Sequence, residues 1–254
     1  MMHADAVRFL RRMYRLARTE IAAVTALFVI AASVLTFLEV AGDLTETDGQ
    51  DFDQAVLTWV QPTAGDPRGP WWVEEAAADL TSLGGISVLT LFAVIAFAFL
   101  LIQRKHLSAA LLAAGLAGGV ALSEGLKAVF GRQRPPLDFQ AVETLNASFP
   151  SGHALLSAVF YLTLGVMLTR AFPKAHLKAF VLGAAMAIAL LIGLTRVYLG
   201  AHWASDVVAG WSVGAGWAMV LWLVAYAIGR RQAVHTGGLH DKPAPDTPPA
   251  VIGE

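Results

Sequence analysis

Long apolar stretches alternate with short polar segments along most of the chain. A helix needs about 20 predominantly apolar residues to cross the hydrocarbon core of a bilayer. Six stretches of that order occur, at residues 21–40, 80–102, 107–130, 153–169, 177–195 and 207–228. This pattern predicts an all-α, polytopic membrane protein with six transmembrane helices.

The polar segment between the first two stretches, residues 41–79, is acidic and carries a weak helical pattern. Apolar residues from Phe52 to Val60 recur at near-helical spacing, which predicts a short interfacial helix at the outer membrane surface. Trp71 and Trp72 are typical of an interfacial aromatic belt. Two interpretations stay open for this segment: a solvated loop with a membrane anchor, or one lip of a substrate entrance.

The two ends of the chain differ from its middle. Residues 1–20 are basic and predict a cytoplasmic N-terminus, residues 21–230 form the membrane domain, and residues 231–254 are rich in Pro and Gly. That last composition predicts a disordered cytoplasmic tail. A signal peptide also begins with a basic run, but its apolar core has only about 7–15 residues. The first stretch is longer, so we expect a retained helix.

The distribution of Lys and Arg orients the chain. When the six stretches alternate from a cytoplasmic N-terminus, most of the 18 Lys and Arg fall on the cytoplasmic side, as the positive-inside rule requires. Both termini are then cytoplasmic, in a multi-pass protein of the cell (inner) membrane. The basic residues that fall outside are Arg68, Lys127, Arg132, Arg134 and Arg196. Most of them lie in or beside three polar motifs, which therefore face the extracytoplasmic (periplasmic) side.

Composition supports a membrane protein. The chain is 56% hydrophobic and 15% charged, with a mean hydropathy of +0.60, whereas a soluble domain carries about 25% charged residues. The balance of 18 basic and 19 acidic residues gives no reason to expect a nucleic-acid partner, and no protein partner can be inferred. The absence of cysteine from the sequence excludes disulfides and thiolate metal sites.

The first polar motif stands at the outer end of the third stretch. It contains Lys127 and Arg134, followed by Pro135 and Pro136. Two cations around a loop that turns back suit a phosphate group. A snorkelling lysine and an interfacial arginine explain the motif equally well. Glu124, one turn before the lysine, is expected to compensate part of its charge or to set its rotamer.

The second motif, Pro150-Ser151-Gly152-His153, leads directly into the fourth stretch. Serine is a favoured helix N-cap, and the free N–H groups of a helix N-terminus bind anions. Glycine allows the backbone to approach a ligand closely. The alternative is a plain N-cap followed by an interfacial histidine.

The third motif, with Arg196, His202 and Asp206, joins the fifth and sixth stretches. On a helix, His202 and Asp206 would be neighbours one turn apart. Asp206 could then accept the Nδ1 proton and leave Nε2 as an oriented nucleophile. The spacing alone is weak, because His-x-x-x-Asp pairs arise by chance, but the arginine beside it strengthens the interpretation.

Together the motifs would place three cations, two histidines, one aspartate and a helix N-terminus in one extracytoplasmic pocket. Phosphoryl transfer relies on positioning and charge neutralisation by groups of this kind. The pocket lies at the membrane surface, where a lipid headgroup would lie. A lipid phosphate is therefore the expected substrate, and the bilayer the expected surrounding.

The three motifs resemble the signature of the type 2 phosphatidic acid phosphatases, which share their active site with the vanadium haloperoxidases. That signature reads Lys-x6-Arg-Pro, then Pro-Ser-Gly-His, then Ser-Arg-x5-His-x3-Asp. The chain matches it at residues 127–135, 150–153 and 196–206. It departs at Thr195, where the family usually has serine, and the retained hydroxyl makes this a mild departure.

The resemblance implies a metal-independent phosphoric-ester or diphosphate hydrolase that needs no cofactor. It implies that His202 attacks phosphorus and becomes phosphorylated, that Asp206 orients it, and that His153 protonates the leaving oxygen. The phosphate-binding residues would be Lys127, Arg134, Ser151, Gly152 and Arg196.

The substrate is less sharply implied. Members of the family act on undecaprenyl diphosphate, phosphatidylglycerophosphate, phosphatidic acid, diacylglycerol diphosphate or phosphorylated lipid A. The short segment 136–149 leaves no room for a large lid, which favours an open site that accepts several headgroups. The compact, bacterial-looking layout favours undecaprenyl diphosphate or a broad range of lipid phosphates, with a lipid A phosphatase as the alternative. Six apolar stretches argue against a vanadate-dependent haloperoxidase. The complete set of catalytic positions argues against a lipid phosphate binder or flippase without hydrolysis.

Overall fold

The computed structural model describes residues 2–44, 46–141 and 146–237, and this part of the chain is helical and contains no strand. The all-helical prediction is therefore confirmed. The α-helices of this part are α1 (Met2–Asp43), α2 (Thr47–Val60), α3 (Trp71–Ser82), α4 (Ile86–Ile102), α5 (His106–Phe130), α6 (Gly152–Thr169), α7 (Ala175–Tyr198) and α8 (Ala204–Gly237). The 3-10 turn η1 (Leu137–Phe139) lies between α5 and α6.

Five of these helices are long and apolar enough to cross a membrane, namely α1 from Glu20 onward, α5, α6, α7 and α8 up to Arg231. Helices α3 and α4 qualify only as a pair, and they meet at a bend of 48°. The predicted span over residues 80–102 is therefore interrupted near its start, at residues 83–85. Gly84 and Gly85 occupy the break, and small, flexible residues of this kind are a common cause of sharp helix kinks. The described part of the chain is thus a multi-pass bundle with five candidate spans, or six when the bent pair is one span.

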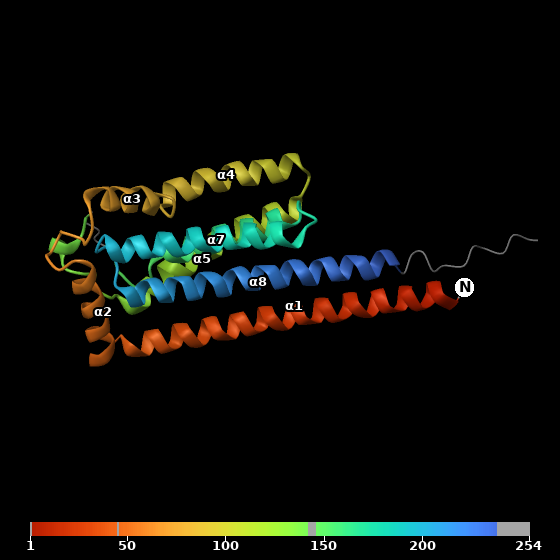
Figure 1. The fold of residues 1–254 in the computed structure, drawn as a ribbon, viewed down its shortest axis with the longest axis horizontal. Helices are drawn as coiled ribbons and strands as arrows, with labels where there is room; N and C mark the ends of the chain where they lie inside the picture. Colours follow the sequence, from red (N-terminus) through yellow and green to blue (C-terminus); the bar gives the residue numbers. More distant parts are fainter. Residues whose placement is uncertain (1, 45, 142–145, 238–254) are drawn as a thin grey trace, which may run out of the picture.

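Helix α6 is the central helix of the bundle, and it contacts α4, α5, α7 and α8. Helix α1 runs along α8 (Figure 1). Half of the apolar stretch of α6 is buried inside the bundle, whereas only 6% of the apolar stretch of α1 is buried. Many apolar side chains of α1, α4 and α7 point outward. These outer faces suit contact with lipid rather than with water.

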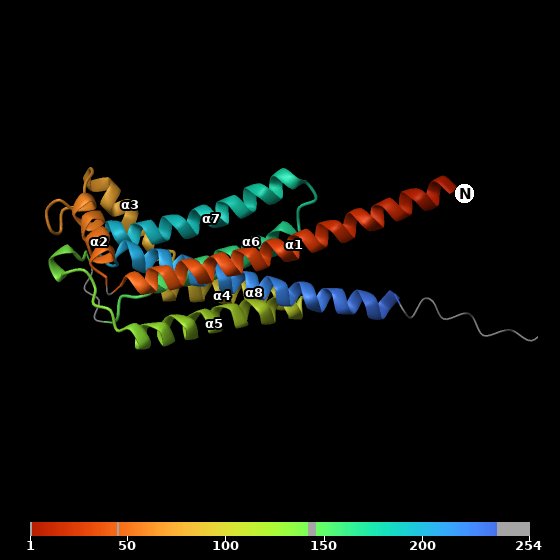
Figure 2. The ribbon, with the colours of Figure 1, turned by 90° about the horizontal axis from the view of Figure 1, so that it is seen from below.

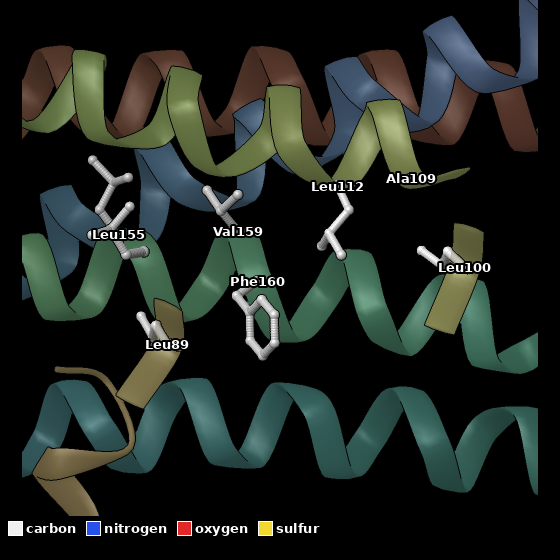
Figure 3. Packing of buried hydrophobic residues seen from close by; sticks show 8 residues of the cluster. Leu89, Leu100, Ala109, Leu112, Leu155, Val159 and Phe160 are labelled. Atoms are coloured by element: carbon white, nitrogen blue, oxygen red, sulfur yellow. The ribbon is translucent and has the colours of Figure 1, made fainter. Parts of the chain in front are cut away.

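The core cluster joins α6 to α4 and α5. Leu155, Val159 and Phe160 of α6 pack with Leu89 of α4 and Leu112 of α5 (Figure 3), and all five are buried. Lipid tails are as apolar as these side chains, so little hydrophobic driving force favours helix association within a bilayer. Close van der Waals packing therefore holds α6 in place.

The short helix α2 crosses one end of the bundle and packs on α1, α7 and α8 (Figures 1 and 2). Helix α2 lies in the segment for which the sequence predicts a short interfacial helix, and its position at the membrane surface stays a prediction. The buried residues of α2 are Asp53, Leu57 and Val60. A buried aspartate on an otherwise apolar face needs a polar partner. The same segment also contains α3, which the sequence pattern did not predict.

Helix α8 continues to Gly237 and so extends past residue 231, where the composition predicts a disordered tail. Helices propagate cooperatively through residues of good helix propensity, and Arg230, Arg231 and Gln232 are of this kind. Residues 238–254, the rest of the predicted tail, lie outside the described residues.

Two glycines allow α8 to approach α6 closely at the end that carries the polar motifs. A Cβ on Gly210 would lie 2.6 Å from the carbonyl oxygen of Ser151, and one on Gly214 would lie 2.5 Å from that of Leu155. This glycine spacing therefore serves helix packing. The backbone N–H of Ser151 also donates to the backbone carbonyl of Asp206 at 2.9 Å. The start of α6 is thus fixed against the first turn of α8.

Replacing Gly210 with alanine is expected to lower the thermal stability of the protein. The added methyl group must displace the backbone of α6, and overpacking of this kind costs about 1–3 kcal/mol. The matched control is Gly183→Ala in α7, where a Cβ meets nothing within 4 Å. That change should be neutral or stabilise by about 0.5–1 kcal/mol, because glycine disfavours helices. Thermal unfolding in detergent compares the two, and a Gly210→Ala protein as stable as the control contradicts the prediction.

Candidate active site

The predicted site residues stand at helix ends and in loops at the end of the bundle that α2 crosses. Lys127 and Arg196 lie in the last turns of α5 and α7, and Asp206 lies in the first turn of α8. The others are Arg134 and His202 in loops, Ser151 at the N-cap of α6, and Gly152 and His153 in its first turn. The fold therefore brings all three motifs to one end of the molecule.

His202 is buried, with 2% of its surface exposed, and its two ring nitrogens have different surroundings. Nε2 lies 3.1 Å from Nη1 of Arg134, while Nδ1 lies 3.3 Å from the Ser148 hydroxyl and 3.5 Å from Oδ2 of Asp206. Burial lowers the pKa of His202 to about 4, against the opposing effect of Asp206 and with a further lowering by Arg134 and Arg196. The imidazole is therefore neutral at physiological pH. The acceptors beside Nδ1 favour the tautomer that leaves the lone pair on Nε2.

Asp206 is fully buried, and both of its carboxylate oxygens accept hydrogen bonds. Oδ2 accepts from the hydroxyl of Ser148 at 2.5 Å and from the N–H of Trp203 at 2.9 Å, and Oδ1 accepts from Arg132 at 2.6 Å. The 3.5 Å to Nδ1 of His202 is longer than an ordinary N–H···O hydrogen bond. The Ser148 hydroxyl can accept from Nδ1 while it donates to Oδ2. The contact between the histidine and the aspartate therefore runs mainly through this serine.

The N-terminus of α6 is capped as its sequence predicts. The hydroxyl of Ser151 accepts from the N–H of Ala154 at 3.5 Å. Gly152 lies against α5, where a Cβ would be 3.2 Å from Oγ of Ser123 and 3.5 Å from Nζ of Lys127. A lysine ammonium thus lies beside the free N–H groups of a helix N-terminus, and this is a favourable place for an anion.

Two of the predicted cations have partners that fix their position. Lys127, whose side chain is 11% exposed, pairs with the exposed Glu124 at 3.0 Å, which agrees with the predicted charge compensation. Arg134 donates from Nε to the carbonyl of Asn146 at 2.9 Å and from Nη1 to the carbonyl of Ala201 at 2.6 Å. Neutral carbonyl groups hold this guanidinium without cancelling its charge.

The bend between α3 and α4 forms one wall of the site. Nη1 of Arg196 donates to the Thr81 hydroxyl at 3.3 Å, while its Nε is buried and has no hydrogen-bond partner among the described residues. A Cβ on Gly84 would lie 3.3 Å from Cδ2 of His153, so the backbone of the bend covers this imidazole. A buried donor left unpaired is costly. We interpret the Nε of Arg196 as a donor for an anionic oxygen.

Sequence reasoning missed the residues behind the histidine–aspartate pair. Arg132 bridges Asp53 and Asp206, at 2.6 Å to each carboxylate. Two features of the sequence point to this bridge in retrospect. Arg132 is a basic residue on the side that topology disfavours, and Asp53 interrupts the apolar face that Leu57 and Val60 continue. Ser148 and Thr81 carry no comparable sequence pattern.

The arrangement suits attack by a neutral imidazole on a phosphate held by cations. In the described ranges, no group of three or more His, Cys, Asp or Glu side chains is placed to hold a metal ion. A helical membrane bundle with this site at one end belongs to the class of membrane phosphatases.

Comparison with known proteins identifies the family. The model of the PAP2 superfamily matches residues 107–230, a range that contains all eight predicted site residues. Phosphatidylglycerophosphatase B of Bacillus subtilis (strain 168) is 34% identical over 146 residues, which are 56% of this chain and 70% of that relative. The chain belongs to the PAP2 superfamily, and it is a membrane phosphatase.

Other relatives match over shorter ranges. Undecaprenyl-diphosphatase of Sulfolobus acidocaldarius is 36% identical over 101 residues, 38% of this chain and 45% of that one. Lipid A 1-phosphatase of Rhizobium etli is 39% identical over 80 residues, 32% of this chain and 30% of that one. The crystal structure of a transmembrane PAP2 type phosphatidylglycerolphosphate phosphatase from Bacillus subtilis aligns with a TM-score of 0.73 at 28% identity, over 79% of this chain and 98% of that chain. The helical bundle is therefore that of a PAP2 membrane phosphatase.

The His202 imidazole is expected to stay neutral down to about pH 4 in the folded protein. Free histidine titrates near pH 6.5, so between about pH 6.5 and about pH 4 the unfolded chain binds a proton here that the folded chain does not. The contribution of His202 to the free energy of unfolding therefore decreases as the pH falls through this window. NMR of nitrogen-labelled histidine, with His202→Gln to assign the signal, measures the pKa. Titration of this signal near pH 6.5 in the folded protein contradicts the prediction.

Proposed function

We propose that this protein hydrolyses lipid phosphates or diphosphates on the extracytoplasmic side of the membrane through a phosphohistidine at His202. The observation that carries the proposal is the asymmetric environment of this buried, neutral imidazole. Arg134 lies on the Nε2 side, and Asp206 with Ser148 lies on the Nδ1 side. A nucleophile held by an orienting group on its far side is the usual arrangement for covalent catalysis.

The reaction has two displacement steps. In the first, the Nε2 lone pair of His202 attacks phosphorus, so that an N–P bond forms and the bond to the leaving oxygen breaks. His153 gives a proton to that oxygen, and Asp206 stabilises the positive charge on the imidazole. In the second step a water molecule attacks phosphorus, His153 takes a proton from it, the N–P bond breaks and inorganic phosphate leaves.

The phosphate-binding groups supply charge where the transition state needs it. The transferred phosphoryl group spreads its negative charge over three equatorial oxygens. The Nε of Arg196, which has no hydrogen-bond partner in the described part of the chain, can receive such an oxygen. The ammonium of Lys127 beside Gly152 can receive another. The Ser151 hydroxyl accepts the cap hydrogen bond and keeps its own proton to donate. Fixed donors of this kind supply much of the catalysis in phosphoryl transfer.

An apolar groove supports a lipid as the substrate. It has a volume of about 340 Å³ and lies between α4 and α5, with Leu156 of α6 in its lining. Its lining includes Ile86, which follows Gly85, and a Cβ on Gly85 would lie 3.9 Å from Nε2 of His153. The end of the groove at Ile86 therefore lies close to His153. A hydrocarbon chain in the groove would have its headgroup near the site.

The relatives narrow the class of substrate. The relative that matches over most of its length is a phosphatidylglycerophosphatase, and one shorter match is an undecaprenyl-diphosphatase. We propose phosphatidylglycerophosphate, undecaprenyl diphosphate and related lipid phosphates such as phosphatidic acid as substrates. Phosphorylated lipid A is the alternative, which the match to a lipid A 1-phosphatase supports.

Replacing His202 with glutamine is expected to lower kcat by at least about 10³-fold, because the nucleophile is lost. Wild-type protein that is incubated briefly with radiolabelled substrate and quenched in base should carry an acid-labile label, which His202→Gln lacks. His176→Gln, at an exposed position in α7, is the control and should keep full activity.

A panel of five substrates, assayed by phosphate release with EDTA present, ranks them by kcat/KM. The five are phosphatidylglycerophosphate, phosphatidic acid, diacylglycerol diphosphate, undecaprenyl diphosphate and lipid A. Full turnover by His202→Gln, or no release from any of the five, rejects the proposal.

The proposed orientation has its own test, which the cysteine-free sequence makes simple. Ala64→Cys lies in the exposed loop between α2 and α3, and Ala175→Cys lies at the exposed start of α7 at the opposite end of the bundle. A membrane-impermeant maleimide should label Ala64→Cys on intact spheroplasts, because the positive-inside rule places that end outside. Ala175→Cys should react only after permeabilisation. The reverse labelling pattern rejects the orientation.

A further inference from the structure

Arg132 stands two residues before Arg134 but contacts the opposite side of the catalytic pair. Its Nη1 donates to the hydroxyl of Ser205 at 2.7 Å and to Oδ1 of Asp206 at 2.6 Å, and its Nη2 donates to Oδ2 of Asp53 at 2.6 Å. These contacts leave the guanidinium of Arg132 engaged with carboxylates and a hydroxyl. Arg134 instead lies beside Nε2 of the histidine. The two arginines therefore serve different partners.

The bridge is anchored on α2. Asp53 is 2% exposed and accepts hydrogen bonds from the N–H of Ser205 at 2.9 Å and from its hydroxyl at 2.5 Å, in addition to Arg132. A buried carboxylate without such partners is strongly disfavoured. Helix α2 thus holds the first turn of α8 both directly, through Ser205, and through the guanidinium.

Local backbone geometry directs Arg132 to this position. Helix α5 ends at Phe130, and the capping residue Gly131 has a φ of 55° in the left-handed region that favours glycine. The chain turns there, and the Cζ atom of Arg132 lies 5.6 Å from the ring centroid of Trp203. A planar cation over an aromatic face is a favourable contact. The guanidinium is therefore held by an aromatic ring as well as by two carboxylates.

We propose that Arg132, held by Asp53, is a positioning residue for the nucleophile. By fixing Oδ1 of Asp206, it leaves Oδ2 directed at Ser148, whose hydroxyl contacts Nδ1 of His202. One forked guanidinium can bind two carboxylates at once, whereas a lysine ammonium has no such planar fork. The inference rests on the proposed role of His202 as the nucleophile.

A polar pocket gives access to this bridge from the side of α2. It has a volume of about 490 Å³, and Asp53, Arg132 and Trp203 are among its lining residues, together with the exposed Asp51. The residues that line it do not include the catalytic histidines. A small cation in solution can therefore reach the place of a deleted guanidinium without crossing the phosphate site.

Chemical rescue tests the proposal directly. Arg132→Ala in the full-length protein is expected to lower kcat by about 10–100-fold, the usual effect of removing a partner that orients an active-site ligand, while KM stays close to wild type. Millimolar guanidinium chloride should restore a large part of kcat, whereas urea or sodium chloride at the same concentration should not. Arg132→Lys should also lose activity, but guanidinium should not restore it, because the lysine side chain occupies the space that guanidinium would need.

A second pair of variants tests the other end of the bridge. Asp53→Asn removes a charge with little change of shape and should lower kcat, and it should add little to the loss in Arg132→Ala because both changes break the same bridge. Asp51→Asn, two residues away on the exposed face of α2, is the matched control and should keep wild-type kcat.

Several outcomes overturn the proposal. The first is an Arg132→Ala protein with wild-type kcat. The second is a folded Arg132→Ala protein with a lowered kcat that guanidinium does not restore. If Arg132→Ala does not fold, equal kcat values for Asp53→Asn and Asp51→Asn overturn it. His202→Gln in the same assay separates the two hypotheses. Turnover by His202→Gln rejects the phosphohistidine mechanism itself, whereas an inactive His202→Gln beside a fully active Arg132→Ala rejects only the positioning role.

Discussion

A carboxylate buried at the start of α8 connects the segments at the functional end of the molecule through hydrogen bonds. Asp206 accepts hydrogen bonds from the loop after α5 through Arg132, from the segment before α6 through Ser148, and from its own helix start through Trp203. A carboxylate in such a place is tolerated only when it is paired and its lone pairs are satisfied. Folding must therefore bring these separate segments to the same point, and the predicted phosphate-binding groups lie on the same segments.

Close packing between α6 and α8 fixes the relative positions of these helices in the membrane part of the bundle. Gly210 and Gly214 let α8 contact the backbone of α6, and the Ser151 N–H donates to the backbone carbonyl of Asp206. In a bilayer this contact depends on fit, because lipid competes equally well for apolar surface. The N-terminus of α6, which carries His153, is consequently held at a fixed height relative to the aspartate.

The features that could be predicted from the sequence are those whose pattern is local. Long apolar runs indicate helices, Ser151 stands directly before the helix that it caps, and the histidine and aspartate of the third motif are four residues apart. The break at Gly84 and Gly85 escaped prediction because glycine barely changes the hydropathy of an apolar run.

Other residues of the site could not be predicted because their partners are distant in sequence. Arg132 and Asp53 are 79 residues apart, and the local pattern of hydrophobic and polar residues around each one gives no sign of the other. An ion pair at that separation leaves no periodic mark, so only the assembled fold shows it. The same holds for Ser148, which is 58 residues from the aspartate that it contacts.

The distribution of charge explains why two arginines so close in sequence have separate partners. Attraction of a phosphate needs cations whose charge is not cancelled, whereas an oriented nucleophile needs an ionised carboxylate behind it. A single guanidinium between the two would be neutralised by the carboxylate and would attract phosphate weakly. Here Arg132 binds the carboxylates, and Arg134 is held mainly by neutral amide oxygens. In the proposed mechanism the phosphate therefore meets an uncancelled positive charge, because the carboxylate already has a cation of its own.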